Sequence, residues 1–289
     1  MKAGFIGAGK VGFSLGKYFV ENGITVTGYY SRSEQSAKSA ADFTNTKTYK
    51  NIENILSDSD TLFITVPDGA ISEIWDYMQN LDIKNKNICH CSGSISSTVF
   101  FNGETRGAFV YSVHPLYAIS DKFNSWKELK NAYFTIEGSQ GHIDEIKEVL
   151  SSLGNKAVVI SDENKPLYHC GAAVVSNLVT SLFSVGADML CRCGFKKEDA
   201  QKALMPLFIG NAEALKKNGP ITSLTGPVER NDISTVKKHL DALSYNSDFK
   251  MLYTLLTEQL IDIANEKHRQ RDYTQMTEVI NDEKHSIHF

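Results

Sequence analysis

This sequence lacks an excess of basic charge, and we expect neither a membrane-spanning apolar run nor a secretion signal. Its 30 Lys and Arg residues are outnumbered by 34 Asp and Glu residues and form no dense block. A nucleic-acid-binding surface needs clustered basic residues, so we expect no nucleic-acid partner. We identify no run as long and apolar as a membrane span and expect no membrane binding. Met1 and Lys2 lead straight into an apolar run without a signal-peptide layout, which predicts a cytoplasmic protein.

Cysteine is also scarce, and its spacing fits no common metal site. The five cysteines are odd in number, and a chain of 289 residues can build a core without disulfides. Two pairs, Cys89 with Cys91 and Cys191 with Cys193, are separated by a single residue, whereas zinc fingers usually place two residues between thiolates. We therefore expect no metal site.

The first half of the chain alternates between short apolar runs and helical patterns. The runs are rich in β-branched and aromatic residues, which is typical of strands in a buried parallel sheet. They cover residues 3–6, 24–30, 61–66, 87–91, 109–113, 133–136 and 157–160. Strands that alternate with helices predict an α/β fold with a Rossmann, doubly wound and mostly parallel sheet.

After Ser161 the pattern is helical throughout. We expect one long apolar helix over residues 166–190, three more over 198–217, 233–243 and 249–266, and a frayed polar tail after His268. The sequence therefore predicts a Rossmann dinucleotide-binding domain over residues 1–161. An all-helical domain for substrate binding and dimerisation is predicted over residues 162–289.

A glycine-rich turn follows the first predicted strand and leads into a helical pattern, which is the context that a dinucleotide-binding turn requires. It reads Gly7-Ala8-Gly9-Lys10-Val11-Gly12. Gly7 permits the tight turn, Gly9 lets the backbone approach a pyrophosphate, and Gly12 lets the helix pack on the sheet. The free N–H groups at the start of the helix would then bind the phosphates.

The end of the second predicted strand indicates which dinucleotide binds. A site for NAD has an acidic residue there, but this chain has Ser31-Arg32-Ser33. The Arg32 guanidinium and the two hydroxyl groups suit a 2′-phosphate, so we favour NADP over NAD. We expect Val66 and Pro67, where the third apolar run ends, to line the same cleft.

Hydride transfer needs an acid or base near the substrate and polar groups that orient it. In a doubly wound sheet these groups lie beyond the carboxyl ends of the strands. Ser92 and Gly93 follow one predicted strand, and His114 ends the next. Ser92 and Gly93 are therefore candidates for substrate binding, and His114 is a candidate acid or base.

The helical half supplies further candidates. Pro166 suits the first position of a helix, which places Lys165 at its cap and His169 about one turn in. Polar side chains on an otherwise apolar helix need partners, so Lys165 and His169 are candidate catalytic residues and Asn177 is a candidate substrate ligand. Arg230, in a predicted loop, can clamp a carboxylate.

The order of these motifs resembles a bacterial group of NADP oxidoreductases that join a Rossmann-like domain to a helical C-terminal domain of unknown function. The chain is also similar to ketopantoate reductase, prephenate dehydrogenase, pyrroline-carboxylate reductase and the 6-phosphogluconate and β-hydroxyacid dehydrogenases. The likeness spans nearly the whole chain. It rests on the glycine turn, Val66-Pro67-Asp68, Ser92-Gly93, His114-Pro115, Lys165-x-x-Tyr168-His169, Ser176-Asn177 and Gly226-Pro227-x-x-Arg230.

The resemblance implies roles for individual residues. Lys165 matches the helical lysine that protonates or orients the substrate oxygen in the β-hydroxyacid enzymes, although those enzymes usually carry Asn where this chain has His169. His114 matches the histidine that bonds the reacting hydroxyl in enzymes like prephenate dehydrogenase. The resemblance leaves open which of Lys165, His169 and His114 donates the proton. The resemblance also implies a homodimer built on the C-terminal helices.

The leading interpretation is an NADPH-dependent oxidoreductase. It would transfer hydride to or from a small carbonyl, hydroxy or imino compound that carries a carboxylate. One alternative is a non-catalytic NADP-binding regulator, which needs no titratable cluster. Another is a deazaflavin-dependent NADP reductase, which the helical C-terminal domain fits less well. Convergence of Lys165, His169, His114 and Ser92 in one cleft would favour the enzyme.

Overall fold

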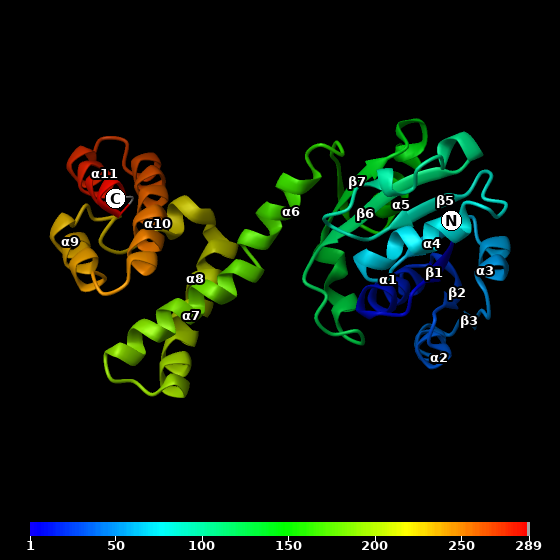
Figure 1. The fold of residues 1–289 in the computed structure, drawn as a ribbon, viewed down its shortest axis with the longest axis horizontal. Helices are drawn as coiled ribbons and strands as arrows, with labels where there is room; N and C mark the ends of the chain where they lie inside the picture. Colours follow the sequence, from blue (N-terminus) through cyan, green and yellow to red (C-terminus); the bar gives the residue numbers. More distant parts are fainter. Residues whose placement is uncertain (288–289) are drawn as a thin grey trace. The chain divides into compact units, whose positions relative to one another are not determined.

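The computed structural model describes residues 1–287. The chain divides into two compact units, the first from Met1 to Ser176 and the second from Asn177 onwards. Both are shown in Figure 1. The boundary predicted near Ser161 lies earlier in the chain, so the first unit also includes helix α6 (Lys165–Val174).

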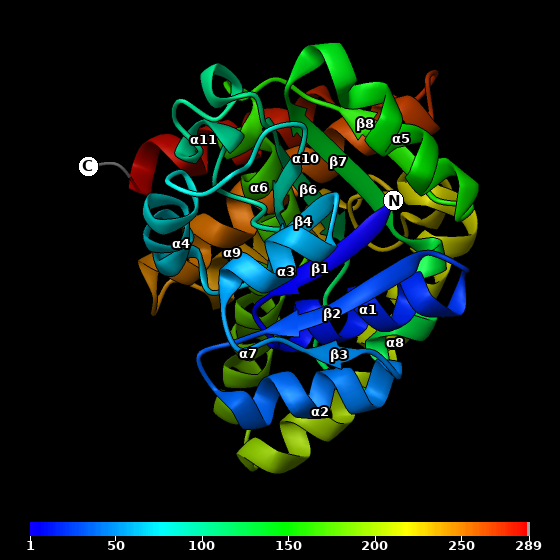
Figure 2. The same cartoon turned by 90° about the vertical axis from the view of Figure 1, so that its right-hand side faces the viewer.

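The first unit is built on one sheet of eight strands in the order β3-β2-β1-β4-β5-β6-β7-β8 (Figure 2). Neighbouring strands pair in parallel except β6 and β7, which are antiparallel. The strands are β1 (Lys2–Ile6), β2 (Thr25–Tyr30), β3 (Lys47–Thr48), β4 (Thr61–Ile64), β5 (Asn87–His90), β6 (Phe109–Leu116), β7 (Tyr133–Gly138) and β8 (Lys156–Val159). The predicted Rossmann-type sheet is confirmed. Only the short β3 was not predicted, because it contains no apolar run.

Alternate strand residues pack against two layers of helices, as expected for a sheet buried on both faces. Phe5 and Phe63 belong to one apolar core, and Ile6 and Ile64 belong to the other. The first core is covered by α1 (Lys10–Glu21), α2 (Glu34–Thr44) and α5 (Ile143–Ser152), and the second by α3 (Ile52–Asp58) and α4 (Ile71–Met78).

The apolar segment after Lys165 forms two helices. α6 ends at Val174 and α7 (Asn177–Arg192) begins after a break, so the predicted single helix over residues 166–190 is wrong. The Ser176 hydroxyl donates a hydrogen bond to the Ala172 carbonyl at 2.7 Å. Because the apolar pattern continues across the break, the sequence did not reveal it.

The same segment passes the length and composition test for a membrane-spanning helix. Within Lys165–Arg192, a stretch of 18 residues has a mean hydropathy of 1.5, and only 6% of that stretch is buried. The expectation that no such run exists is therefore wrong. Polar residues such as His169 and Asn177 divide the run in the sequence, which is why it was missed.

The second unit is helical throughout its described residues, which confirms the all-helical C-terminal region. Its helices are α7, α8 (Lys197–Ser223), α9 (Ile233–Ala242), α10 (Ser247–Lys267) and α11 (Thr274–Ile287). α8 is kinked at Gly219, where φ is 72°. The last three helices gather around an apolar core that includes Ile261 and Met276 (Figure 1). The tail after His268 does not fray within the described residues, because α11 buries Met276 and Ile280.

Candidate functional site

A cleft of about 250 Å³ lies where β1, β2 and β4 end. Parallel strands end at one edge of the sheet, and nucleotides bind at that edge in such folds. Of the predicted cofactor residues, those that line the cleft are Gly7, Ala8, Gly9, Ser31, Arg32, Val66 and Pro67. Seven further lining residues were not predicted: Ile6, Tyr30, Ser36, Thr65, Ala70, Glu73 and Ile74. We call this the cofactor cleft.

Glycine is required for a different reason at each of the three glycine positions of the turn. Gly7 has a φ of 109°, and a Cβ there would lie 2.7 Å from the Thr65 carbonyl oxygen. A Cβ on Gly12 would lie 2.5 Å from the Gly7 carbonyl oxygen, so α1 packs directly on the turn. A Cβ on Gly9 would lie 3.9 Å from the Thr65 carbonyl oxygen, which is an ordinary van der Waals distance. Packing alone therefore does not require Gly9, whereas a phosphate approaching the backbone does.

The start of α1 is suited to bind an anion. Gly9 is its N-cap, and among residues 1–287 no side-chain hydrogen bond caps this end of the helix. Lys10 and Val11 form the first helical turn and do not line the cofactor cleft. Ser33 also lies outside the lining and caps α2, because its Oγ accepts the Ser36 N–H at 3.2 Å.

A second polar group lies where β5 and β6 meet α6. Lys165 begins α6 and is only 1% exposed. Its Nζ donates a hydrogen bond to Ser112 Oγ on β6 at 2.5 Å, and Ser112 Oγ donates to the Ser92 carbonyl at 3.2 Å. The predicted helix-cap lysine is thus buried against the end of the sheet instead of being solvated.

Two histidines lie beside this lysine. His114 Nδ1 and the Tyr168 hydroxyl are 2.6 Å apart. A Cβ on Gly93 would lie 2.9 Å from both His114 Nε2 and His169 Nδ1, so only glycine fits between the two rings. The structure therefore brings Lys165, His114, His169 and Gly93 together within the first unit. We call these residues, with Ser92, Ser112 and Tyr168, the Lys165 cluster.

A carboxylate links the Lys165 cluster to the cofactor cleft. Asp68, in the short helix η1 (Asp68–Ala70), accepts hydrogen bonds from Ser92 Oγ at 2.9 Å and from Ser94 Oγ at 3.0 Å. The preceding residue, Pro67, lines the cleft. Asp68 therefore fixes the loop after β5 next to the edge where the dinucleotide binds.

Three residues of this arrangement were not predicted as site residues: Asp68, Ser112 and Tyr168. Asp68 and Tyr168 lie inside two motifs of the resemblance, Val66-Pro67-Asp68 and Lys165-x-x-Tyr168-His169. Their place in these motifs could have marked them as site residues. Ser112 offered no signal, because its contact with Lys165 depends on how α6 packs on the sheet.

Burial is the largest cause of the lowered pKa values in and beside the Lys165 cluster. It lowers the pKa of Lys165, and the nearby groups Glu137, Cys91 and Asp68 oppose that shift. Burial, followed by the charge of Lys165, lowers the pKa of His114 to about 4 and that of His90 to about 4. His114 is therefore neutral at pH 7. Lys165, whose pKa moves toward neutrality, is the better candidate acid.

The two remaining candidates belong to the second unit. Asn177 begins α7, and Arg230 lies exposed in the loop between α8 and α9. The Arg230 N–H donates to the Gly226 carbonyl at 3.2 Å, so this loop is a hydrogen-bonded turn. The roles of Asn177 and Arg230 in substrate binding stay predictions.

Two segments of the chain match known protein families. Residues 2–88 match the family described as coenzyme F420-dependent NADP oxidoreductases, and residues 132–260 match a domain of unknown function, DUF2520. The sequence matches no curated protein. A solved structure of a protein from Thermotoga maritima is 25% identical, with a TM-score of 0.74, and the match covers 92% of this chain and 99% of that one.

Two further solved structures share the fold. A Bacteroides fragilis protein assigned as an NADP oxidoreductase is 22% identical, with a TM-score of 0.63 and coverage of 90% of this chain and 98% of that one. A 1-pyrroline-5-carboxylate reductase from Streptococcus pyogenes is 15% identical, with a TM-score of 0.61 and coverage of 92% and 98%.

The Rossmann sheet, the glycine turn and the cofactor cleft define a dinucleotide-binding protein. The family matches add the activity: the chain is an NADP-dependent oxidoreductase, in which residues 2–88 match the NADP oxidoreductase family and residues 132–260 match DUF2520.

Proposed function

We propose that this oxidoreductase transfers hydride between NADPH and a small imino or carbonyl compound that carries a carboxylate. The observation that carries the proposal is the buried Lys165 amine, held by Ser112 beside His114 and Gly93. Support for an imine comes from the similar fold of the pyrroline-5-carboxylate reductase, because a pyrroline carboxylate is a cyclic imine with a carboxylate.

In this proposal Lys165 supplies the proton. NADPH, when bound, supplies the hydride that adds to the C=N or C=O carbon. The substrate nitrogen or oxygen gains the proton as an Nζ–H bond of the Lys165 ammonium breaks, which leaves a neutral amine. Ser112 Oγ fixes the position of Nζ at 2.5 Å, and the Tyr168 hydroxyl fixes the His114 ring at 2.6 Å. His114 Nε2 and His169 then face the loop at Gly93 and can hydrogen bond the reacting group.

We assign orientation of the substrate first to polar groups of the loop after β5. Ser92 and Gly93 form the loop after β5, whose N–H groups suit a carboxylate or carbonyl oxygen. Asn177 and the Arg230 guanidinium are the candidates for the substrate carboxylate, because a guanidinium binds a carboxylate through two parallel hydrogen bonds.

The test is an NADPH-oxidation screen against cyclic imino acids and 2-oxo acids. With an active substrate, Lys165→Met should lower turnover by roughly a hundredfold to ten-thousandfold, which is typical of lost general acid–base catalysis. NADPH affinity should not change, because the cofactor cleft is untouched. His114→Ala and His169→Ala should give smaller losses. Native turnover by Lys165→Met would overturn the assignment and move the acid to a histidine.

The same screen separates two other functions. A non-catalytic NADP-binding regulator would bind NADPH and oxidise it with no compound of the panel. A deazaflavin-dependent reductase would oxidise NADPH only after a deazaflavin is added. The family matched by residues 2–88 is the observation that favours this last outcome.

We also propose a cytoplasmic homodimer. All five cysteines are free thiols, and thiols persist in reducing compartments. The helices α7 and α8 expose apolar side chains that a second copy of the chain can cover, and two-fold dimers are the commonest closed assembly.

A further inference from the structure

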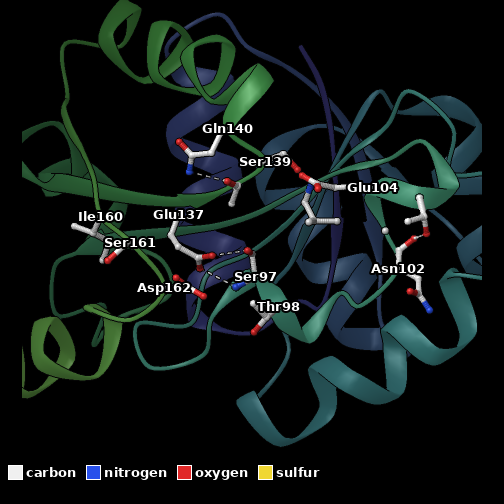
Figure 3. Close-up of a pocket in the computed structure, with 14 residues that line it drawn as sticks. Ser97, Thr98, Asn102, Glu104, Glu137, Ser139, Gln140, Ile160, Ser161 and Asp162 are labelled. Carbon is white, nitrogen blue, oxygen red and sulfur yellow. Dashed lines mark hydrogen bonds between the residues drawn. The ribbon is translucent and has the colours of Figure 1, made fainter.

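A polar pocket of about 450 Å³ opens on the face of the sheet where Ser112 lies. Figure 3 shows Glu137 and Ser97 meeting in its middle, with Asp162 on one side and Glu104 on the other. Glu137 comes from β7 and is only 5% exposed, whereas Glu104 and Asp162 are exposed. Glu137 is therefore the one of these carboxylates that is removed from water.

The Glu137 carboxylate is held in one position. The Ser97 N–H donates to Oε2 at 2.7 Å, and the Ser97 hydroxyl donates to Oε1 at 2.5 Å. The Ser96 hydroxyl adds a longer hydrogen bond to Oε1 at 3.3 Å. These donors belong to η2 (Ser97–Val99) and its cap, which continue from the loop at Gly93.

Strand register places Glu137 next to the partner of Lys165. In the antiparallel pairing of β6 and β7, Glu137 lies directly opposite Ser112. Side chains of directly opposed residues project from the same face of a sheet. Ser112 Oγ accepts a hydrogen bond from the Lys165 amine. The Lys165 amine and the Glu137 carboxylate are therefore both buried beside Ser112.

Glu137 and Lys165 nevertheless do not touch as an ion pair. Within residues 1–287, no carboxylate forms an ion pair with Lys165. The amine thus remains available for transfer of a proton, while the buried carboxylate acts through space, where low dielectric strengthens the attraction.

We propose that Glu137 is a positioning residue that keeps Lys165 in its ammonium form. This proposal rests on the proposed function, in which the Lys165 ammonium donates the proton. Burial lowers the pKa of Lys165, and Glu137 is the largest of the groups that oppose this shift. Without Glu137, Lys165 would lose its proton at a lower pH.

The other titratable groups that face Lys165 are Cys91, Asp68, His90 and His114. Burial raises the pKa of Cys91 to about 12, so this group is a neutral thiol at pH 7. Both histidines have a pKa of about 4 and are neutral as well. Asp68 is thus the second anion, and it will preserve part of the stabilisation when Glu137 is replaced.

The test measures the amine of Lys165 directly. In protein labelled with ¹³C at lysine Cε, an NMR titration follows each amine, and Lys165→Met assigns the resonance. Glu137→Gln should lower the pKa of Lys165 by about one to two units, the usual effect of a nearby opposite charge. Glu104→Gln, which removes an exposed carboxylate from the same pocket, should leave it unchanged. An unchanged Lys165 pKa in Glu137→Gln overturns the proposal.

A second variant and a second readout complete the test. If Glu137→Gln does not fold, Glu137→Asp keeps the charge but withdraws it by one methylene, and a smaller fall in the same direction is expected. No fall in that variant also overturns the proposal. With an active substrate, the alkaline limb of the pH–rate profile of the Glu137 variant should move to lower pH by the same amount as the Lys165 pKa. A moved amine pKa with an unmoved limb would support Glu137 and reject Lys165 as the proton donor.

Discussion

Arg32 is the residue on which the preference for NADPH depends. It lies just beyond β2 and lines the cofactor cleft, together with the hydroxyl-bearing residues Ser31 and Ser36. A guanidinium can make two charge-assisted hydrogen bonds to a phosphate, whereas the ribose hydroxyl of NADH offers it no charge. Its side chain is exposed in the structure and therefore accessible to a 2′-phosphate.

Arg32→Ala should weaken NADPH binding by about tenfold to a hundredfold, because a hydrogen bond between charged groups contributes about 1.5–3 kcal/mol. NADH binding should hardly change. Calorimetric titration with both cofactors measures this difference. Arg106→Ala is the control, since Arg106 is exposed in η3 (Glu104–Arg106) outside the cleft. Equal affinity of the native protein for NADPH and NADH would reject the role of Arg32.

His90 is a buried histidine that the proposed reaction does not use. It is fully buried at the end of β5, and its Nδ1 accepts the Ser92 N–H at 3.2 Å. Burial and the charge of Lys165 lower its pKa to about 4, against about 6.5 for an unperturbed histidine. The unfolded chain therefore takes up this proton below about pH 6.5, and the folded protein does not until about pH 4.

The free energy of unfolding should consequently fall as the pH drops from 6.5 toward 4. Between pH 7 and pH 5 the His90 contribution amounts to about 2 kcal/mol. In His90→Asn the side-chain oxygen can still accept the Ser92 N–H but does not titrate, so this variant should lose less stability than the native protein. Urea unfolding at the two pH values measures the difference. Equal losses in both proteins would show that His90 is not buried in its neutral form.

At the scale of elements, the position of α1 depends on glycines that face the sheet. A Cβ on Gly16 would overlap the Tyr29 hydroxyl, and Tyr29 is fully buried on β2. That hydroxyl donates to the Gly12 carbonyl at 3.3 Å, so Tyr29 has little room to move. The start of α1, where phosphates would bind, is therefore fixed by close contact between helix and strand.

Gly16→Ala should lower the free energy of unfolding by about 1–3 kcal/mol, because overpacking outweighs the helix propensity of about 1 kcal/mol that alanine adds. NADPH affinity should fall as well, since α1 must shift. Gly171→Ala in α6 is the matched control: a Cβ there meets nothing within 4 Å, so stability should stay equal or rise. Urea unfolding and calorimetry provide both readouts. A Gly16→Ala protein as stable as the native one would contradict this packing.

The sequence predicted those elements whose signal is local. The apolar run over residues 61–66 and the glycine turn after β1 each depend on a few neighbouring residues, and both were found. The contact of Lys165 with Ser112 and the register of Glu137 could not be predicted, because they join segments far apart in the chain. The break between α6 and α7 was missed for another reason: the apolar pattern continues across it.

At the scale of the whole molecule, the second unit leaves many apolar side chains in water. Leu207 is 72% exposed and Leu178 is 57% exposed. Other exposed apolar residues of α7 and α8 are Leu182, Met205, Phe208, Ile209 and Leu215. Monomeric proteins rarely expose apolar surface on this scale. The exposed side chains of α7 also account for part of the hydropathy that makes Lys165–Arg192 resemble a membrane span.

A second copy of the chain is the occupant that we predict for this surface. Light scattering at micromolar concentration should give twice the chain mass of 32.1 kDa. Leu207→Glu should shift the species toward the monomer, because a buried unpaired carboxylate at an interface is costly. Phe101→Glu, at an exposed apolar residue of the first unit, should remain dimeric. If the native protein has only the mass of one chain, or floats with lipid vesicles as a monomer, the dimer is rejected and the apolar helices serve another partner.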